Sequence, residues 1–191
     1  VVHVFGRRPN PDGDDATDMR AHVVKWIPAV VMTAYTYIVE GEDAESLGLG
    51  WDGPKAFVKR VVAGMVVMLG ANVVLEPLHE RLGAEQMQSE MAEFTEASVL
   101  ERLFIALTAG VTEELLFRGY ALERIESETG SRLVAAASST AAFVLAHKSD
   151  TWSWGSLVLI AQPATLITTI YLRSRGLLAA MTVHARNDAV G

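Results

Sequence analysis

Apolar residues in this chain are gathered into long runs instead of recurring with an amphipathic period. Five runs stand out, at 23–39, 61–75, 103–117, 133–146 and 155–172. Each approaches the ~20 residues that a helix needs to cross a bilayer. A sixth and shorter run begins at Leu177 and is interrupted by His184, Arg186 and Asp188. The pattern predicts a helix over each of the six runs.

The same runs could form buried helices of a soluble protein, so their number matters. Half of the 191 residues are apolar and the mean hydropathy is positive, which exceeds what one soluble core needs. We therefore predict an all-α integral membrane protein, a bundle of about six transmembrane helices. Its expected location is the cell membrane, which it would cross several times with the lipid bilayer as its surroundings.

The segments between the runs are acidic and account for most of the net charge of −7. Segment 40–52 holds five acids and no base, and segment 76–101 holds seven acids with Arg81 as its one lysine or arginine. This distribution excludes a basic nucleic-acid-binding surface. The chain has no cysteine, which excludes disulfides, thiolate metal sites and a cysteine nucleophile.

Composition divides the chain into three parts. Residues 1–20 are polar and carry turn signals, and we expect them to form an N-terminal tail. Residues 21–98 would hold the first two membrane helices and an acidic connector. Residues 99–191 contain the remaining runs and every ionisable residue that interrupts a run in a helical spacing.

The stretch GVTEELLFRGYALERIE places Glu113, Glu114 and Arg118 at the end of the third run. Ionisable residues in a membrane helix are costly and usually face a cavity. Glu114 and Arg118 are four residues apart, so they share a helix face and can pair. Glu113 is turned ~100° away and lacks a partner on its own helix. Glu113 is therefore the candidate general base.

Two histidines are the next polar intrusions. His147 ends the fourth run, and His184 lies one helical turn before Asp188. If the third and fourth helices turn near Gly130, Glu113 and His147 both lie seventeen residues from the turn, or ~25 Å along the helices. The two side chains can then meet. The depth of His184 is left open: either the turn near Gly176 lies deep, or Pro163 bends the fifth helix.

Three motifs in this order carry a family resemblance: Glu113-Glu114-x-x-x-Arg118, Phe143-x-x-x-His147 and His184-x-x-x-Asp188. Over residues 100–188 the chain resembles the membrane-embedded CAAX-processing and bacteriocin-processing proteases, the CPBP or Abi family. The resemblance implies an all-helical membrane fold with a water-filled catalytic cavity enclosed by the last four helices. Residues 99–191 would be this catalytic four-helix region.

The resemblance also implies roles for the six residues in an intramembrane endopeptidase. Glu113 would activate a water that His147 helps to hold. His184 and Asp188 would stabilise the oxyanion of the tetrahedral intermediate. Glu114 and Arg118 would support the site, and no cofactor would be needed. At position 188 the eukaryotic relatives carry asparagine, so the aspartate is a departure. A peptide or a membrane protein would be the substrate.

Two alternatives remain at this stage. Glu113, His147 and His184 offer the oxygen and nitrogen ligands of a catalytic zinc, which would make the protein a zinc-dependent protease. The polar residues could also only cross-link helices in a non-catalytic membrane protein, such as an immunity factor or scaffold.

Overall fold

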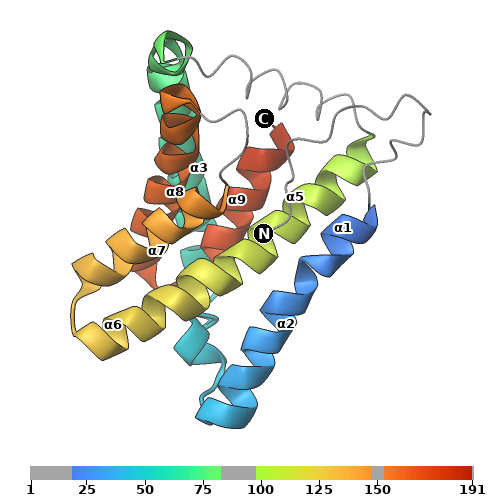
Figure 1. Cartoon of the computed structure of the whole chain (residues 1–191), viewed down its shortest axis with the longest axis vertical. Helices are drawn as coiled ribbons and strands as arrows, with labels where there is room; N and C mark the ends of the chain where they lie inside the picture. The colour runs from blue at the N-terminus through green and yellow to red at the C-terminus, as the bar shows by residue number, and fades with distance from the viewer. Residues whose placement is uncertain (1–18, 83–97, 148–152, 191) are drawn as a thin grey trace.

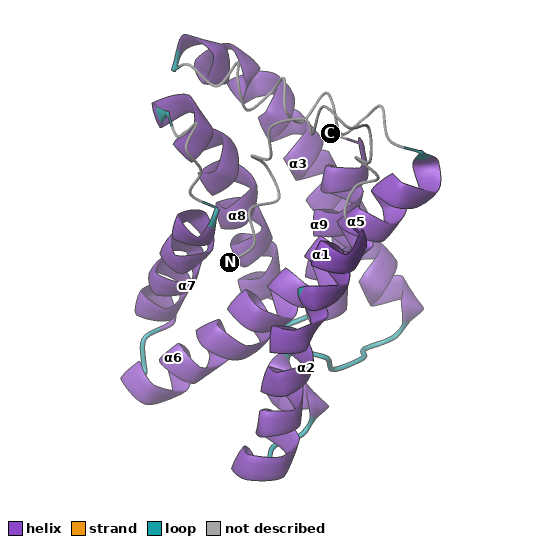
Figure 2. Ribbon diagram, turned by 45° about the vertical axis from the view of Figure 1, so that its right-hand side comes forward, coloured by secondary structure: helices purple, strands orange, loops and turns teal. Residues whose placement is uncertain are grey.

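The computed structural model describes residues 19–82, 98–147 and 153–190, and this part of the chain is helical without a strand (Figure 2). The described part of the chain starts with α1 (Met19–Val24), α2 (Trp26–Tyr35) and the π-helical turn η1 (Thr36–Glu40). A short 3-10 helix, η2 (Ala44–Leu47), leads to α3 (Pro54–Arg81). Residues 1–18 of the predicted tail and residues 83–97 of the connector lie outside the described residues, whereas residues 19 and 20 already belong to α1.

The second half of the chain begins with one long rod. α5 (Val99–Glu114), the π-helix η3 (Leu115–Leu122) and α6 (Glu123–Thr129) follow one another without a break (Figure 1). The chain then continues through α7 (Arg132–Ala146), α8 (Trp154–Ser174) and α9 (Leu177–Val190). Each of the six predicted runs is helical, and the third helix extends well beyond its run.

Three helical segments of the described residues are long and apolar enough to cross a membrane: His22–Glu40, Pro54–Arg81 and Trp154–Ser174. α7 is apolar but shorter. Large apolar side chains point outward from the first two segments, with Ile38 80% and Val74 74% exposed, as lipid contact requires. The fold is that of an all-α membrane protein, as predicted, with half of the six runs meeting the length and hydropathy of a full span.

The α6–α7 turn depends on two residues. Gly130 has a φ of 65°, in the left-handed region where glycine is favoured, and it ends α6. The Ser131 side chain then accepts a hydrogen bond from the Val134 amide and caps α7. α7 therefore folds back beside η3 at the position that the sequence predicted.

α9 packs against α5, and glycine permits the close approach. A Cβ on Gly110 would lie 2.9 Å from the Ala185 amide nitrogen and 2.9 Å from the Met181 carbonyl oxygen. These are backbone atoms, which cannot move aside without shifting the helix. The small residue thus sets the distance between the two helices.

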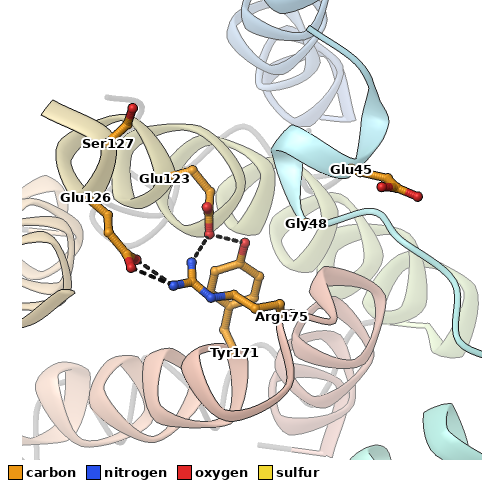
Figure 3. A pocket seen from close by; sticks show the side chains of 7 residues that line it. All are labelled: Glu45, Gly48, Glu123, Glu126, Ser127, Tyr171 and Arg175. Atoms are coloured by element: carbon orange, nitrogen blue, oxygen red, sulfur yellow. Dashed lines mark hydrogen bonds and ion pairs between the residues drawn. The ribbon is translucent and has the colours of Figure 1, made fainter. Parts of the chain in front are cut away.

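The α8–α9 turn lies deep because side chains of α6 hold it. Arg175 has a φ of 49°, unusual for a residue with a side chain, and its guanidinium pairs with Glu123 and Glu126 (Figure 3). The Tyr171 hydroxyl donates to Glu123 at 2.6 Å. Burial acts to raise the pKa of Glu126, but hydrogen bonds from Arg175 and then Arg132 outweigh it, and the pKa is lowered.

These groups and Gly48 line a cavity of about 410 Å³ (Figure 3). Gly48 lies against the hydroxyl end of the Tyr171 ring. The Leu177 amide donates to the Gly48 carbonyl oxygen at 2.9 Å, which fixes the start of α9. The Leu177 side chain lies 2.9 Å from where a Cβ of Gly119 would be. The turn is therefore level with Gly119 and not with Gly130, and this depth brings His184 level with the two glutamates.

We expect Gly110→Ala to lower the thermal stability of the purified protein by about 1–3 kcal/mol, because the added methyl group meets backbone. Gly70→Ala is the matched control, since nothing lies within 4 Å of its Cβ position in α3. The control should unfold at or slightly above the temperature of the unsubstituted protein. Equal melting temperatures for both variants would contradict the close packing of α5 on α9.

Candidate active site

Glu114 and Arg118 form a fully buried ion pair, and both side chains are 0% exposed. Arg118 Nη1 donates to Glu114 Oε1 at 2.8 Å. The other guanidinium nitrogens reach α8, where Nη2 donates to the Ala164 carbonyl oxygen at 2.9 Å and Nε donates to Thr168 Oγ1 at 3.2 Å. The predicted pairing on one helix face is present, and it also ties the start of η3 to α8.

His184 lies against the same carboxylate. Its Nδ1 is 2.7 Å from Glu114 Oε1, and its Nε2 is 3.3 Å from Asp188 Oδ2. A carboxylate at each ring nitrogen favours the doubly protonated ring, which donates at both nitrogens. The ring is thus fixed in orientation from two sides.

Glu113 faces nitrogen atoms on three other helical segments. Its Oε2 lies 3.6 Å from His147 Nε2 and 3.9 Å from His184 Nε2. Its Oε1 lies 3.7 Å from Lys25 Nζ. The side chain is 15% exposed. The sequence left this carboxylate without a partner on its own helix, and the structure supplies partners from α7, α9 and the α1–α2 junction.

Phe143 of α7 contacts both histidines. His147 Nδ1 is 2.8 Å from the Phe143 carbonyl oxygen, so Nδ1–H donates there and Nε2 faces Glu113. The Phe143 ring lies 4.4 Å from the His147 ring and 5.9 Å from the His184 ring, centroid to centroid. The Arg118 guanidinium lies over the same ring at 4.6 Å. Phe143 therefore packs between both histidine rings and the buried guanidinium.

The structure brings all six predicted site residues together. Glu113, Glu114 and Arg118 come from the α5–η3 rod, His147 from the end of α7, and His184 and Asp188 from α9. The π-helix begins directly after the two glutamates, and such turns occur often at functional sites. Among the described residues, no group of three or more His, Asp or Glu side chains is arranged to hold a metal ion.

A chain of hydrogen bonds that the sequence analysis missed begins at Asp188. Asn187 Nδ2 donates to Asp188 Oδ1 at 3.5 Å, and Asn72 Nδ2 of α3 donates to Asn187 Oδ1 at 3.2 Å. Gln162 Nε2 of α8 donates to Asn72 Oδ1 at 2.6 Å. Asn72 and Gln162, like Lys25, interrupt apolar runs, and that interruption was the available signal.

The comparison with protein families agrees with this arrangement. The profile of the Rce1-like type II CAAX prenyl endopeptidases matches residues 95–190, half of the chain. The chain belongs to this family. Comparison with curated proteins and with solved structures gives no match.

The match contains all six predicted site residues and the helices α5 to α9. At the level of the family, the chain is a CAAX-type intramembrane protease, and the predicted resemblance is confirmed. α1, α2 and α3 lie outside the matched segment. Lys25 and Asn72, which come from this part of the chain, are therefore contacts that family membership does not account for.

We expect Arg118→Met to lower the free energy of unfolding by about 3–5 kcal/mol, because it strands the Glu114 carboxylate as a buried charge. Thermal unfolding of the purified protein measures this. Arg173→Met is the control, since Arg173 is exposed in the last turn of α8 and should leave the melting temperature unchanged. A melting temperature of Arg118→Met equal to that of the control would mean that the pair does not hold the site.

Proposed function

We propose that this protein is a multi-pass intramembrane endopeptidase in which Glu113 activates a water for peptide-bond hydrolysis without a metal cofactor. The observation that carries the proposal is the position of Glu113 Oε2, 3.6 Å and 3.9 Å from the Nε2 atoms of His147 and His184. These separations are too long for direct hydrogen bonds, so all three atoms stay available to a water that lies beside them. A carboxylate beside a held water is the arrangement that general-base hydrolysis needs.

The proposed reaction uses these positions in turn. Glu113 takes a proton from the water, and the resulting hydroxide attacks the carbonyl carbon of the scissile peptide bond. The carbonyl oxygen becomes an oxyanion. The proton then passes from Glu113 to the leaving nitrogen, the C–N bond breaks, and the products are a carboxylic acid and an amine. His147 orients the water through Nε2, with Nδ1–H held by the Phe143 carbonyl oxygen.

The oxyanion needs a donor, and His184 is the candidate. Nδ1–H is committed to Glu114 at 2.7 Å, so the donor is Nε2–H. Asp188 lies 3.3 Å from the same nitrogen and accepts its hydrogen before the reaction, and the oxyanion shares that hydrogen when it forms. An ionised carboxylate cannot donate to an oxyanion, so the aspartate at this position serves by orienting the ring.

The family and the surroundings indicate the substrate class. A site enclosed by membrane helices acts on a peptide or a membrane protein that can enter from the bilayer of the cell membrane. The family description points to a prenylated cysteine followed by three residues. An internally quenched farnesylated peptide is therefore the first probe, and the unprenylated peptide of the same sequence is the second.

We expect Glu113→Gln to abolish cleavage of the peptide probe and to leave folding intact, because the amide keeps the shape but accepts no proton. Cleavage by purified protein is followed by fluorescence and by mass spectrometry of the products. Glu128→Gln, at an exposed position of α6, is the control and should cleave like the unsubstituted protein. Undiminished turnover in Glu113→Gln would remove the carboxylate from the mechanism.

The same assay separates the two alternatives. In a zinc protease that uses Glu113, His147 and His184, chelation abolishes cleavage, zinc restores it, and active protein carries one zinc. The metal-free mechanism predicts full activity after chelation. A non-catalytic scaffold cleaves neither probe, and membrane peptides from cells with and without the gene would then be identical by mass spectrometry.

We expect Asp188→Asn to keep a substantial fraction of the activity, because the amide oxygen still accepts from His184. Asp188→Ala removes the acceptor and should lose a factor of about 10² to 10³ in kcat. Steady-state cleavage of the probe measures both. Asn187→Ala is the comparison. If Asn187→Ala loses activity while Asp188→Ala cleaves normally, the residue that supports His184 is Asn187 and our assignment of the third motif is wrong.

A further inference from the structure

Lys25 lies at the junction of α1 and α2, inside the candidate span His22–Glu40. The helix breaks here because Pro28 has no amide hydrogen to offer the Val24 carbonyl oxygen. The Lys25 side chain is 13% exposed, and its ammonium lies 3.7 Å from Glu113 Oε1. The break in the first span therefore places the Lys25 ammonium beside the candidate general base, Glu113.

The neighbouring residue fixes this position. Trp26 Nε1 donates to Thr108 Oγ1 at 3.3 Å, which joins the start of α2 to α5 just over one turn from Glu113. A lysine within a membrane span costs a few kcal/mol unless it reaches the interface or a counter-charge. The contact with Glu113 supplies the counter-charge. The Trp26–Thr108 hydrogen bond also holds Lys25 beside Glu113, because Lys25 and Trp26 are adjacent at the start of the same helix.

The two oxygens of Glu113 have different neighbours. Lys25 lies at Oε1, and both histidines lie at Oε2. An ammonium at Oε1 draws that oxygen away from the histidines and leaves Oε2 as the one that faces the water. It also favours the ionised carboxylate, which is the form that accepts a proton.

Charge balance also favours a cation at Glu113. The other two carboxylates of the described site, Glu114 and Asp188, lie 2.7–3.3 Å from the cationic groups of Arg118 and His184. Among the described residues, Glu113 has no ionic contact this short, and Lys25 is the cation beside its Oε1. A cation here offsets the charge of the carboxylate when the oxyanion forms nearby, because like charges repel strongly at low dielectric.

We propose that Lys25 is a positioning residue of the active site: its ammonium binds Glu113 Oε1, holds the carboxylate ionised and turns Oε2 toward the water. This inference rests on the proposed function. It adds to the family-matched region a functional residue from the first span, which that region does not contain.

The test uses full-length purified protein in nanodiscs and the farnesylated peptide probe. Lys25→Met removes the charge and keeps the length of the side chain. We expect kcat to fall at least about tenfold and KM to stay within about twofold, because the effect acts through Glu113 and not through substrate binding. Lys25→Arg keeps a cation within reach and should recover most of the lost kcat. Lys55→Met, at an exposed position of α3, should match the unsubstituted protein.

A second measurement tests the contact without using activity. Melting temperatures are compared for Lys25→Met, Glu113→Gln and the double variant. We expect the double variant to lose less than the two single losses together, because each single change strands the partner. Additive losses would overturn the Lys25–Glu113 pair, as would a Lys25→Met kcat equal to that of Lys55→Met. A loss of kcat that Lys25→Arg does not recover would overturn the electrostatic role.

The two proposals fail in different ways. Unchanged cleavage in Glu113→Gln contradicts the glutamate mechanism, and the melting temperatures still decide whether the ion pair exists. Abolished cleavage in Glu113→Gln together with a normal Lys25→Met contradicts the role of Lys25 alone.

Discussion

One buried carboxylate oxygen, Glu114 Oε1, joins the helices that make the site. It accepts from Arg118 at 2.8 Å and lies 2.7 Å from His184 Nδ1. A fully buried carboxylate is stable only when cations offset its charge, and each of these two cations also links the carboxylate to a further helix. Arg118 also donates hydrogen bonds to Ala164 and Thr168 of α8, and His184 belongs to α9. The burial of Glu114 thus fixes where α5, α8 and α9 meet.

The position of the neighbouring Glu113 depends on this arrangement, but its contacts differ from those of Glu114. Because Glu114 forms the short contacts with Arg118 and His184, Glu113 is left with contacts of 3.6–3.9 Å, which are longer than hydrogen bonds. In the proposed mechanism the two adjacent glutamates therefore have different roles: Glu114 holds the helices together, and Glu113 transfers the proton. Their different surroundings support this division.

Helical spacing accounts for the parts of the site that the sequence predicted. Glu114 pairs with Arg118 because they are one turn apart, and Glu113 meets His147 because both are equally far from Gly130. The depth of His184 could not be predicted, since it depends on Arg175 reaching back about fifty residues to Glu123 and Glu126. Lys25 was missed for a related reason, because no spacing links it to Glu113. Six helices were predicted correctly, but hydropathy alone did not reveal that α5 and α9, which carry the charges, fall short of a full apolar span.

The most direct test of this account is the protonation state of His184. Solid-state 15N NMR on histidine-labelled protein reports it, with the His184→Gln variant assigning the signal. Held between Glu114 and Asp188, both ring nitrogens should carry hydrogen at neutral pH. A ring with one unprotonated nitrogen would mean that His184 is not clamped by two carboxylates, and the oxyanion donor and the charge balance of the site would both be wrong.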